Sequence, residues 1–169
     1  MAVSLTGRKY GPPQFTNESS LLQAKYNITA MFYDILDYPW ERIHEKWRPV
    51  LLADIRGQVL EAGVGTGRNL RRYHHTVKLM GLDLSDAMLR KARKRVKTSP
   101  CKTKLIHEDA TIMKSVDANQ FDWVFSTFMC CVMPDNLQEL AIEQFGRAFK
   151  PSRADDFGFL NWCIQRIRV

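Results

Sequence analysis

The sequence predicts an α/β fold, with a doubly wound parallel sheet and helices on both of its faces. Three observations support this prediction. From residue 57 onward short apolar runs alternate with amphipathic stretches, a glycine-rich turn follows the first apolar run, and an acidic residue follows each of the next two. Strands that alternate with helices in this way are typical of parallel sheets joined by right-handed crossovers.

Length and composition indicate a single globular domain. The chain has 169 residues, of which 25% are charged and 45% hydrophobic, and this balance excludes a disordered, collagenous or disulfide-rich protein. It contains no apolar run of about 18 residues that would span a membrane. The first fifteen residues lack the continuous apolar segment of a secretory signal. Four cysteines without zinc-like spacing favour a reduced, cytoplasmic protein without a metal site.

The elements are expected in the following order. Residues 1–17 read as a flexible leader, and apolar spacings of three and four predict helices over 18–36 and 40–53. Ser85 is a suitable N-cap for a helix that ends at Lys97. The remaining strands are expected at 58–62, 77–82, 104–107, 121–127 and 157–163, and the remaining helices at 68–73 and 136–149.

The positive charge is concentrated in one stretch. The net charge is +7, and residues 68–97 hold ten basic side chains but only two acidic ones. The apolar positions of the helix expected there fix an inward face, so its basic residues are expected to point outward. Such a patch attracts an anionic membrane surface or a polyanion.

A glycine-rich turn follows the first expected strand, in the run LEAGVGTGRN. In a parallel sheet the ligand binds at the carboxyl ends of the strands, where this turn would lie. The pattern is GxGxG, whereas a dinucleotide-binding loop needs a glycine where Arg68 stands, and the GK[ST] of a phosphate-binding loop is absent. Glu61 precedes the turn and favours a cationic ligand.

Two further acids follow the next two strands. Asp83 lies 22 residues after Glu61, where a carboxylate accepts the hydroxyls of a ribose. Asp109 and Ala110 follow the third strand and are placed to reach the edge of an adenine. An acidic loop, a ribose carboxylate and an acid at the adenine edge together fit S-adenosylmethionine.

Four ordered motifs support a resemblance to a known family: LEAGVGTGRN, GLDLSDAML, HEDAT and FDWVFSTFMCCVMPD. With these motifs the chain, over about residues 20–151, resembles the class I S-adenosylmethionine-dependent methyltransferases, which have a Rossmann-like sheet. Within that superfamily it resembles the branch that includes the ubiquinone/menaquinone and phospholipid N-methyltransferases, the methyltransferase type 11 domain. Residues 26–34 resemble the N-terminal YDxxAxxYD segment of that branch, which covers the cofactor.

The resemblance implies a role for each part of the site. The glycines line the methionine portion of the cofactor, Glu61 organises the loop and the ammonium group, Asp83 holds the ribose, and Tyr26 stacks over the sulfonium. The implied cofactor-binding residues are Tyr26, Glu61, Ala62, Gly63, Gly65, Thr66, Gly67, Asn69, Asp83, Leu84, Met88, Asp109, Ala110, Ser126, Thr127 and Phe128. No catalytic residue is assigned, because methyl transfer mainly needs alignment of the acceptor, and a general base only if the acceptor arrives protonated.

The end of the chain departs from the family pattern. The family reads LKPGG before its fifth strand, where this chain reads FKPSR, and it continues into an antiparallel hairpin that we expect to be missing here. We therefore expect one domain over 18–169, divided into cap helices (18–56), a cofactor-binding core (57–151) and a divergent or truncated tail (152–169). The strand at 157–163 would then be an exposed edge through which a homodimer can pair.

The function expected from these observations is methyl transfer from S-adenosylmethionine to a small or lipid-like acceptor, of the quinol or phospholipid-headgroup type. An apolar wall at 128–133 favours such an acceptor, and the basic helix at 90–97 favours peripheral contact with an anionic membrane. One alternative is a degenerate domain that binds the cofactor without turnover. Methylation of RNA is a third reading, which the lack of aromatic residues within the basic run disfavours.

Overall fold

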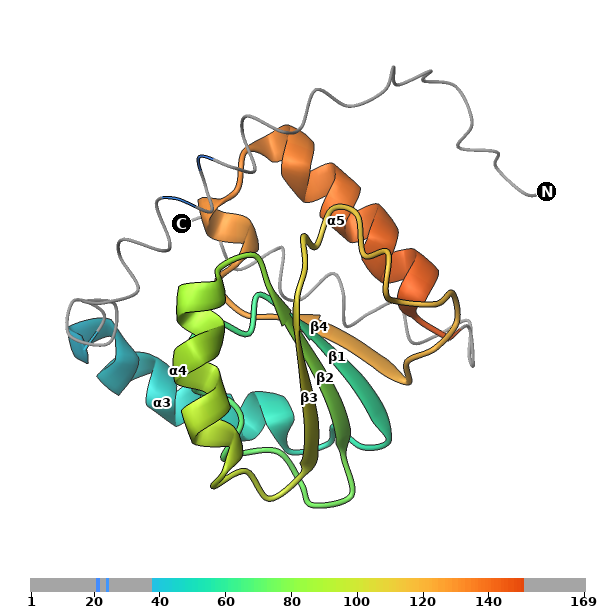
Figure 1. Ribbon diagram of the computed structural model, residues 1–169. Helices are drawn as coiled ribbons and strands as arrows, with labels where there is room; N and C mark the ends of the chain where they lie inside the picture. The colour runs from blue at the N-terminus through green and yellow to red at the C-terminus, as the bar shows by residue number, and fades with distance from the viewer. Residues whose placement is uncertain (1–20, 22–23, 25–37, 151–169) are drawn as a thin grey trace.

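The computed structural model describes residues 38–150, together with Leu21 and Ala24 (Figure 1). The elements of the core are β1 (Gln58–Ala62), β2 (Lys78–Asp83), α4 (Asp86–Val96), β3 (Lys102–His107), β4 (Trp123–Ser126), a short 3-10 helix η1 (Cys130–Val132) and α5 (Asp135–Ala148), and the helix α3 (Tyr38–Leu52) precedes them. The fold is the predicted Rossmann-like α/β arrangement.

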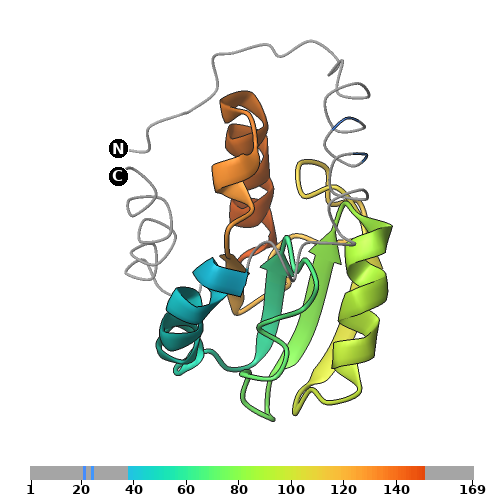
Figure 2. The ribbon, with the colours of Figure 1, turned by 90° about the vertical axis from the view of Figure 1, so that its left-hand side faces the viewer.

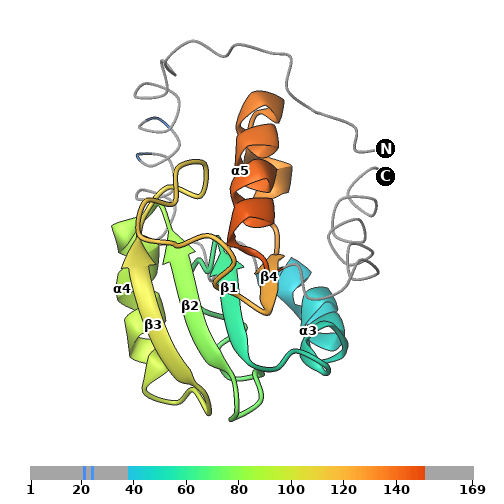
Figure 3. The ribbon, with the colours of Figure 1, turned by 90° about the vertical axis from the view of Figure 1, so that its right-hand side faces the viewer.

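The four strands form one parallel sheet in the order β3-β2-β1-β4 (Figure 3). Glu61 is in register with Gly81 on one side and with Phe125 on the other, and Asp83 is in register with His107. Because all four strands run in the same direction, their carboxyl ends meet at one edge of the sheet. The glycine-rich turn, Asp83 and the segment after β4 therefore lie together at that edge.

Helices cover both faces of the sheet. One hydrophobic cluster joins α3 and α4 to the sheet through residues such as Leu52, Leu89 and Ala92. A second cluster packs α5 on the opposite face through Ala141 and Phe145. Figures 2 and 3 show α5 rising beyond the ends of the strands, so that it borders the edge where the strands end.

Most predicted elements are confirmed, with shifts at their ends. The strand at 58–62 is as predicted, β2 is displaced by one residue, β3 begins two residues earlier than predicted, and β4 is shorter than predicted. The helices predicted at 40–53 and 136–149 are α3 and α5. Ser85 caps α4 as predicted, because its Oγ accepts a hydrogen bond from the Met88 amide at 3.2 Å.

The helix predicted at 68–73 is wrong. The segment forms successive turns, in which the Leu70 amide donates to the Gly67 carbonyl at 3.2 Å and the Arg72 amide donates to the Asn69 carbonyl at 2.8 Å. These bonds span three residues instead of four. Six residues provide few helical hydrogen bonds to offset the cost of helix nucleation, and the Asn69 side chain is held by Glu61 instead.

Several predictions concern segments outside the described residues. They are the leader at 1–17, most of the helix at 18–36, Tyr26, and the tail at 152–169 with its strand at 157–163. Within the part that the structure describes, none of the helices combines the length and the apolar character that crossing a bilayer demands.

Candidate functional site

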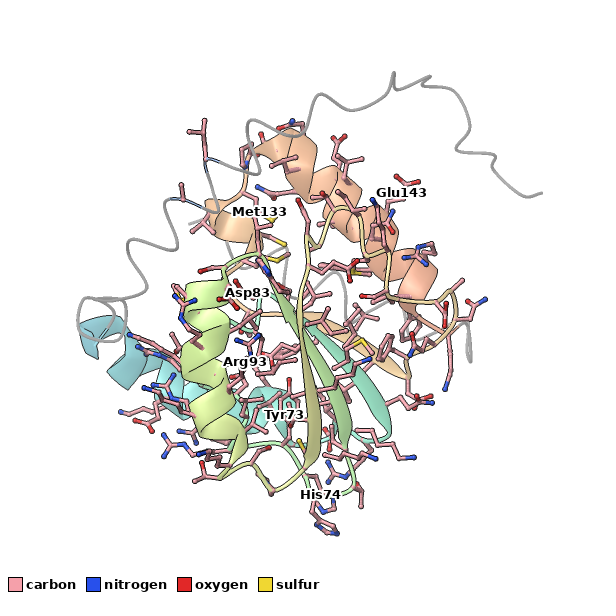
Figure 4. The ribbon with its side chains drawn as sticks, viewed as in Figure 1. Tyr73, His74, Asp83, Arg93, Met133 and Glu143 are labelled. Carbon is pink, nitrogen blue, oxygen red and sulfur yellow. The ribbon has the colours of Figure 1, made fainter. Side chains whose placement is uncertain are left out.

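A cavity of about 160 Å³ opens at the carboxyl edge of the sheet. It is formed by the end of β2, the loop after β3, the turn after β1, the start of α4 and the segment after β4. Figure 4 shows two of its residues, Asp83 and Met133, on the same side of the molecule. The predicted residues that line it are Gly63, Gly65, Asp83, Leu84, Met88, Asp109, Ala110, Thr127 and Phe128.

The turn after β1 depends on glycine for two different reasons. Gly65 has a φ of +55°, and a Cβ added to it would meet only the Gly63 carbonyl oxygen at 4.0 Å, so this position faces open space beside the cavity. Gly67 has a φ of +80°, and a Cβ there would lie 2.6 Å from Leu70 Cδ1 and 3.2 Å from Ala92 Cα. Gly65 therefore leaves room for a ligand, whereas Gly67 lets α4 pack directly on the loop.

Asp83 joins the turn to α4. Its Oδ2 accepts a hydrogen bond from the Gly65 amide at 2.8 Å, and its Oδ1 accepts one from the Ser85 amide at 2.9 Å. Burial raises the pKa of Asp83, and the two amide hydrogen bonds oppose that shift. Each carboxylate oxygen has a second lone pair that remains available to the hydroxyl of a ligand.

Glu61 lies beneath the turn and is 1% exposed. Asn69 Nδ2 donates to its Oε1 at 2.6 Å, and the Tyr73 hydroxyl donates to its Oε2 at 2.9 Å. Burial raises the pKa of Glu61 to about 7, although both hydrogen bonds lower it. Tyr73, labelled in Figure 4, is itself buried, and burial raises its pKa well above the usual value.

Arg48 of α3 is a site residue that the sequence analysis missed. It is 6% exposed, its Nη1 donates to Asn69 Oδ1 at 2.6 Å, and its Cζ lies 5.6 Å from the centre of the Phe128 ring. The apolar spacing that predicts this helix includes Trp47 and Val50, which would place both on its buried face. In the structure Trp47 is 49% exposed and Val50 is 72% exposed, so that spacing does not mark the buried face of α3.

Arg48 lines a second, smaller cavity beside the first. Its lining also includes residues that the sequence analysis predicted, namely Glu61, Gly63, Gly65, Thr66, Asn69, Thr127 and Phe128. Arg68, which was not predicted, lines it as well. Because Gly63, Gly65, Thr127 and Phe128 line both cavities, they separate a polar compartment from a mainly apolar one. Phe128 occupies this boundary with a φ of +62°, a conformation that costs an aromatic residue about 1–2 kcal/mol and is found preferentially at functional sites.

The remaining predicted residues are distributed as follows. Asp109 Oδ1 accepts hydrogen bonds from the Thr111 amide at 2.9 Å and from the Thr111 hydroxyl at 2.8 Å, which fixes the loop after β3. Ala62, Gly67 and Ser126 line neither cavity. Ser126 Oγ at the end of β4 is buried, and among the described residues it has no hydrogen-bond partner.

The segment after β4 supplies an apolar wall. Met129, Val132 and Met133 line the larger cavity together with Phe128, and α5 adds Leu137. These are four of the six residues expected at 128–133. Phe128 and Val132 are also 42% and 44% exposed, so the wall continues from the cavity to the molecular surface.

The sequence analysis expected all basic residues of the helix at 90–97 to point outward, and the structure contradicts this for one of them. Arg90, Arg93, Lys94 and Lys97 are exposed, but Arg95 is half-buried and donates to the Thr66 carbonyl at 2.6 Å. Among the residues that the structure describes, no group of three histidine, cysteine, aspartate or glutamate side chains is arranged to hold a metal ion.

Comparisons with known proteins agree with this geometry. A family model described as a methyltransferase domain matches residues 59–152. Phosphatidylethanolamine N-methyltransferase from Cereibacter sphaeroides is 36% identical over 107 residues, which are 60% of this chain and 52% of that protein. The chain thus spans about half the length of this curated relative.

Two solved structures share the fold. The chain is 25% identical to the protein in the DhpI-SAH complex structure, with a TM-score of 0.67, and the match covers 79% of this chain and 65% of that one. The DhpI-SAM-HEP complex gives 23% identity and a TM-score of 0.63, covering 83% of this chain and 64% of that one.

Proposed function

Because this chain belongs to the methyltransferase domain family, we propose that it binds S-adenosylmethionine at the carboxyl edge of its sheet and transfers the methyl group to a small or lipid-like acceptor. The observation that carries the proposal is the convergence on one cavity of Gly65, Asp83 and Asp109, which come from three separate loops. A solved neighbour at 25% identity, the DhpI-SAH complex, supports the same ligand class.

The residues present fit this cofactor. Gly65 leaves an open cradle that a side chain would fill, and Asp83 keeps a lone pair on each carboxylate oxygen for the ribose hydroxyls. Asp109 and Ala110 line the cavity where the adenine is expected. Arg48 and Arg68 supply positive charge to the smaller polar cavity, and the Glu61 carboxyl group also lines it. These groups match the carboxylate and the ammonium group at the amino-acid end of the cofactor.

The cofactor supplies an electrophilic methyl group on a sulfonium, and the protein has to align the acceptor with it and exclude water. Alignment of this kind contributes roughly 7–11 kcal/mol to lowering a barrier. Thr127 and Phe128 line both cavities and so lie beside the point where the two ends of the cofactor, and with them its sulfonium, would meet. No side chain of the described site has to act as a general base if the acceptor arrives deprotonated.

The acceptor is proposed to be lipid-like, of the phospholipid-headgroup or quinol type. The apolar wall formed by Phe128, Met129, Val132 and Met133 supports this class, because it would bury an apolar group next to the cofactor. The name of the Cereibacter sphaeroides relative points to the same class. We further propose that the exposed basic residues of α4 bring the protein to an anionic membrane surface.

The proposal predicts that the chain binds S-adenosylhomocysteine, the demethylated product. In calorimetric titrations, Gly65→Ala and Asp83→Asn are each expected to weaken binding by about tenfold or more, because the first strains the loop and the second removes a charged acceptor worth about 1.5–3 kcal/mol. The matched controls are Gly146→Ala and Asp54→Asn. Gly146 lies on α5 with no heavy atom within 4 Å of an added Cβ, and Asp54 is exposed.

Turnover separates the enzyme from the alternative domain that binds the cofactor without catalysis. The wild-type chain is expected to methylate at least one member of a panel of quinols, catechols and phosphatidylethanolamine vesicles. The release of S-adenosylhomocysteine measures the reaction. Binding without turnover on the whole panel would favour the non-catalytic domain. Absence of binding by the wild-type chain would refute both readings.

A further inference from the structure

The helix α4 uses its basic residues in two different ways. Arg90 and Arg93 are exposed and form ion pairs with Asp86 on the same helix, the Arg93 pair at 3.2 Å (Figure 4 labels Arg93). Arg95 is half-buried and reaches the turn after β1 instead. It follows the buried Ala92 by three residues, so the two lie on the same side of the helix.

Arg95 makes two hydrogen bonds to one residue of the turn. Its Nη1 donates to the Thr66 carbonyl at 2.6 Å and also to the Thr66 hydroxyl. Thr66 is 2% exposed and lies between Gly65 and Gly67. A charged donor makes a hydrogen bond about twice as strong as a neutral one, and here it acts on a peptide group that a glycine on each side leaves conformationally free.

Close packing of α4 on the turn makes this contact possible. A Cβ on Gly67 would lie 3.2 Å from Ala92 Cα, so no side chain separates the helix from the loop at this point. Arg95 stands almost one turn further along α4 and reaches back to Thr66. At the end of β2, Asp83 accepts a hydrogen bond from the Gly65 amide at 2.8 Å. Two consecutive residues of the loop are thus fixed from two elements, Gly65 from the end of β2 and Thr66 from the last turn of α4.

We propose that Arg95 is a positioning residue for the cofactor loop. It lines neither cavity, so it acts through Thr66 by fixing the peptide beside Gly65 in the orientation that leaves the cradle open. The loop is then already in its binding conformation before the ligand arrives, and the ligand does not have to offset the entropy of ordering it. This inference rests on the proposed function for the identity of the ligand.

The first test compares Arg95→Gln with Lys94→Gln, which removes the same charge from the neighbouring exposed residue. In calorimetric titrations with S-adenosylhomocysteine, Arg95→Gln is expected to weaken binding about tenfold, equivalent to about 1.4 kcal/mol. Lys94→Gln is expected to bind as the wild type does. Arg95→Lys should recover part of the loss, because lysine keeps the charge but not the planar fork of donors. Equal affinities of Arg95→Gln and Lys94→Gln would overturn the proposal.

The second test needs no ligand. Hydrogen exchange of the amides at 63–67 is expected to be faster in Arg95→Gln than in Lys94→Gln, because the loop opens more often without its anchor. Thr66→Val removes the hydrogen bond from Arg95 to the Thr66 hydroxyl and leaves the one to the carbonyl. It is expected to speed up hydrogen exchange of the same amides by less than Arg95→Gln does. This milder variant serves the test if Arg95→Gln folds poorly. Unchanged exchange in both variants contradicts the role of Arg95, whereas failure of the wild type to bind S-adenosylhomocysteine contradicts only the proposed function.

Discussion

At Glu61 a carboxyl group is buried among both polar and charged neighbours. Asn69 and Tyr73 donate to its two oxygens, Arg48 on α3 attracts its negative charge, and Asp83 on β2 repels it. Burial outweighs the favourable interactions and raises the pKa to about 7. The folded protein therefore retains the Glu61 proton at pH values where the unfolded chain has already lost it.

The expected consequence is a loss of stability as the pH rises. Between the unfolded pKa and the folded pKa the native state binds more protons than the unfolded state, so the free energy of unfolding falls with pH. From about pH 5 to about pH 8 this residue is expected to lower the free energy of unfolding by about 2 kcal/mol. Chemical denaturation of the wild type and of Glu61→Gln at both pH values measures the effect, because the difference between their free energies of unfolding should change by that amount. A difference that is independent of pH would contradict the shifted pKa.

Sequence reasoning placed three acidic residues correctly at one edge of the sheet. Glu61 is the last residue but one of β1, Asp83 ends β2 and Asp109 follows β3, so their meeting at one edge of a parallel sheet was predictable from order alone. Arg48 was not, because an arginine between Trp47 and Pro49 looks like an exposed helix residue until the fold places it against Asn69 and Phe128. The left-handed backbone at Phe128 also has no signal in a single sequence.

Among the secondary structure elements, α4 has the best-defined beginning. The Ser85 hydroxyl accepts from the Met88 amide at 3.2 Å and is 1% exposed. We expect Ser85→Ala to lower the free energy of unfolding by about 1 kcal/mol, because a helical amide loses its partner, and Ser85→Gly to cost only a few tenths of that. Denaturant titration of the two variants side by side checks the cap. Equal losses in both would indicate that packing, and not capping, explains the role of the hydroxyl.

The elements that the sequence predicted correctly are strands with a short, mainly apolar run and helices with an apolar stripe over several turns. Residues 68–73 have neither, because Leu70 and Tyr73 are their only apolar residues and a single spacing of three does not distinguish a helix from consecutive turns. The inward direction of Arg95 was missed for a related reason. The hydrophobic pattern shows which residues are buried, but it does not show that a half-buried cation will find a carbonyl on the neighbouring loop.

For the whole molecule, the proposed membrane contact gives a quantitative test. Each basic side chain that contacts an anionic bilayer contributes about 1 kcal/mol, so we expect salt-sensitive sedimentation with anionic vesicles. Reversing Arg90, Arg93, Lys94 and Lys97 to glutamate should abolish it. The matched control reverses four exposed lysines on other elements, namely Lys46, Lys78, Lys102 and Lys114. A wild-type protein that stays in the supernatant at low salt, or a control that loses binding equally, contradicts a contact through α4.

The strand order also has a consequence for how the chain is made. β1 lies in the middle of the sheet, but its partner on one side, β4, is separated from it by some sixty residues, since Val59–Ala62 pairs with Trp123–Ser126. During synthesis, β2 emerges soon after β1, whereas the other edge of β1 has no strand to pair with until the ribosome has translated β4. The strand that carries Glu61 therefore spends this interval with an open edge, and we expect the nascent chain to pair with other chains through that edge unless a chaperone shields it.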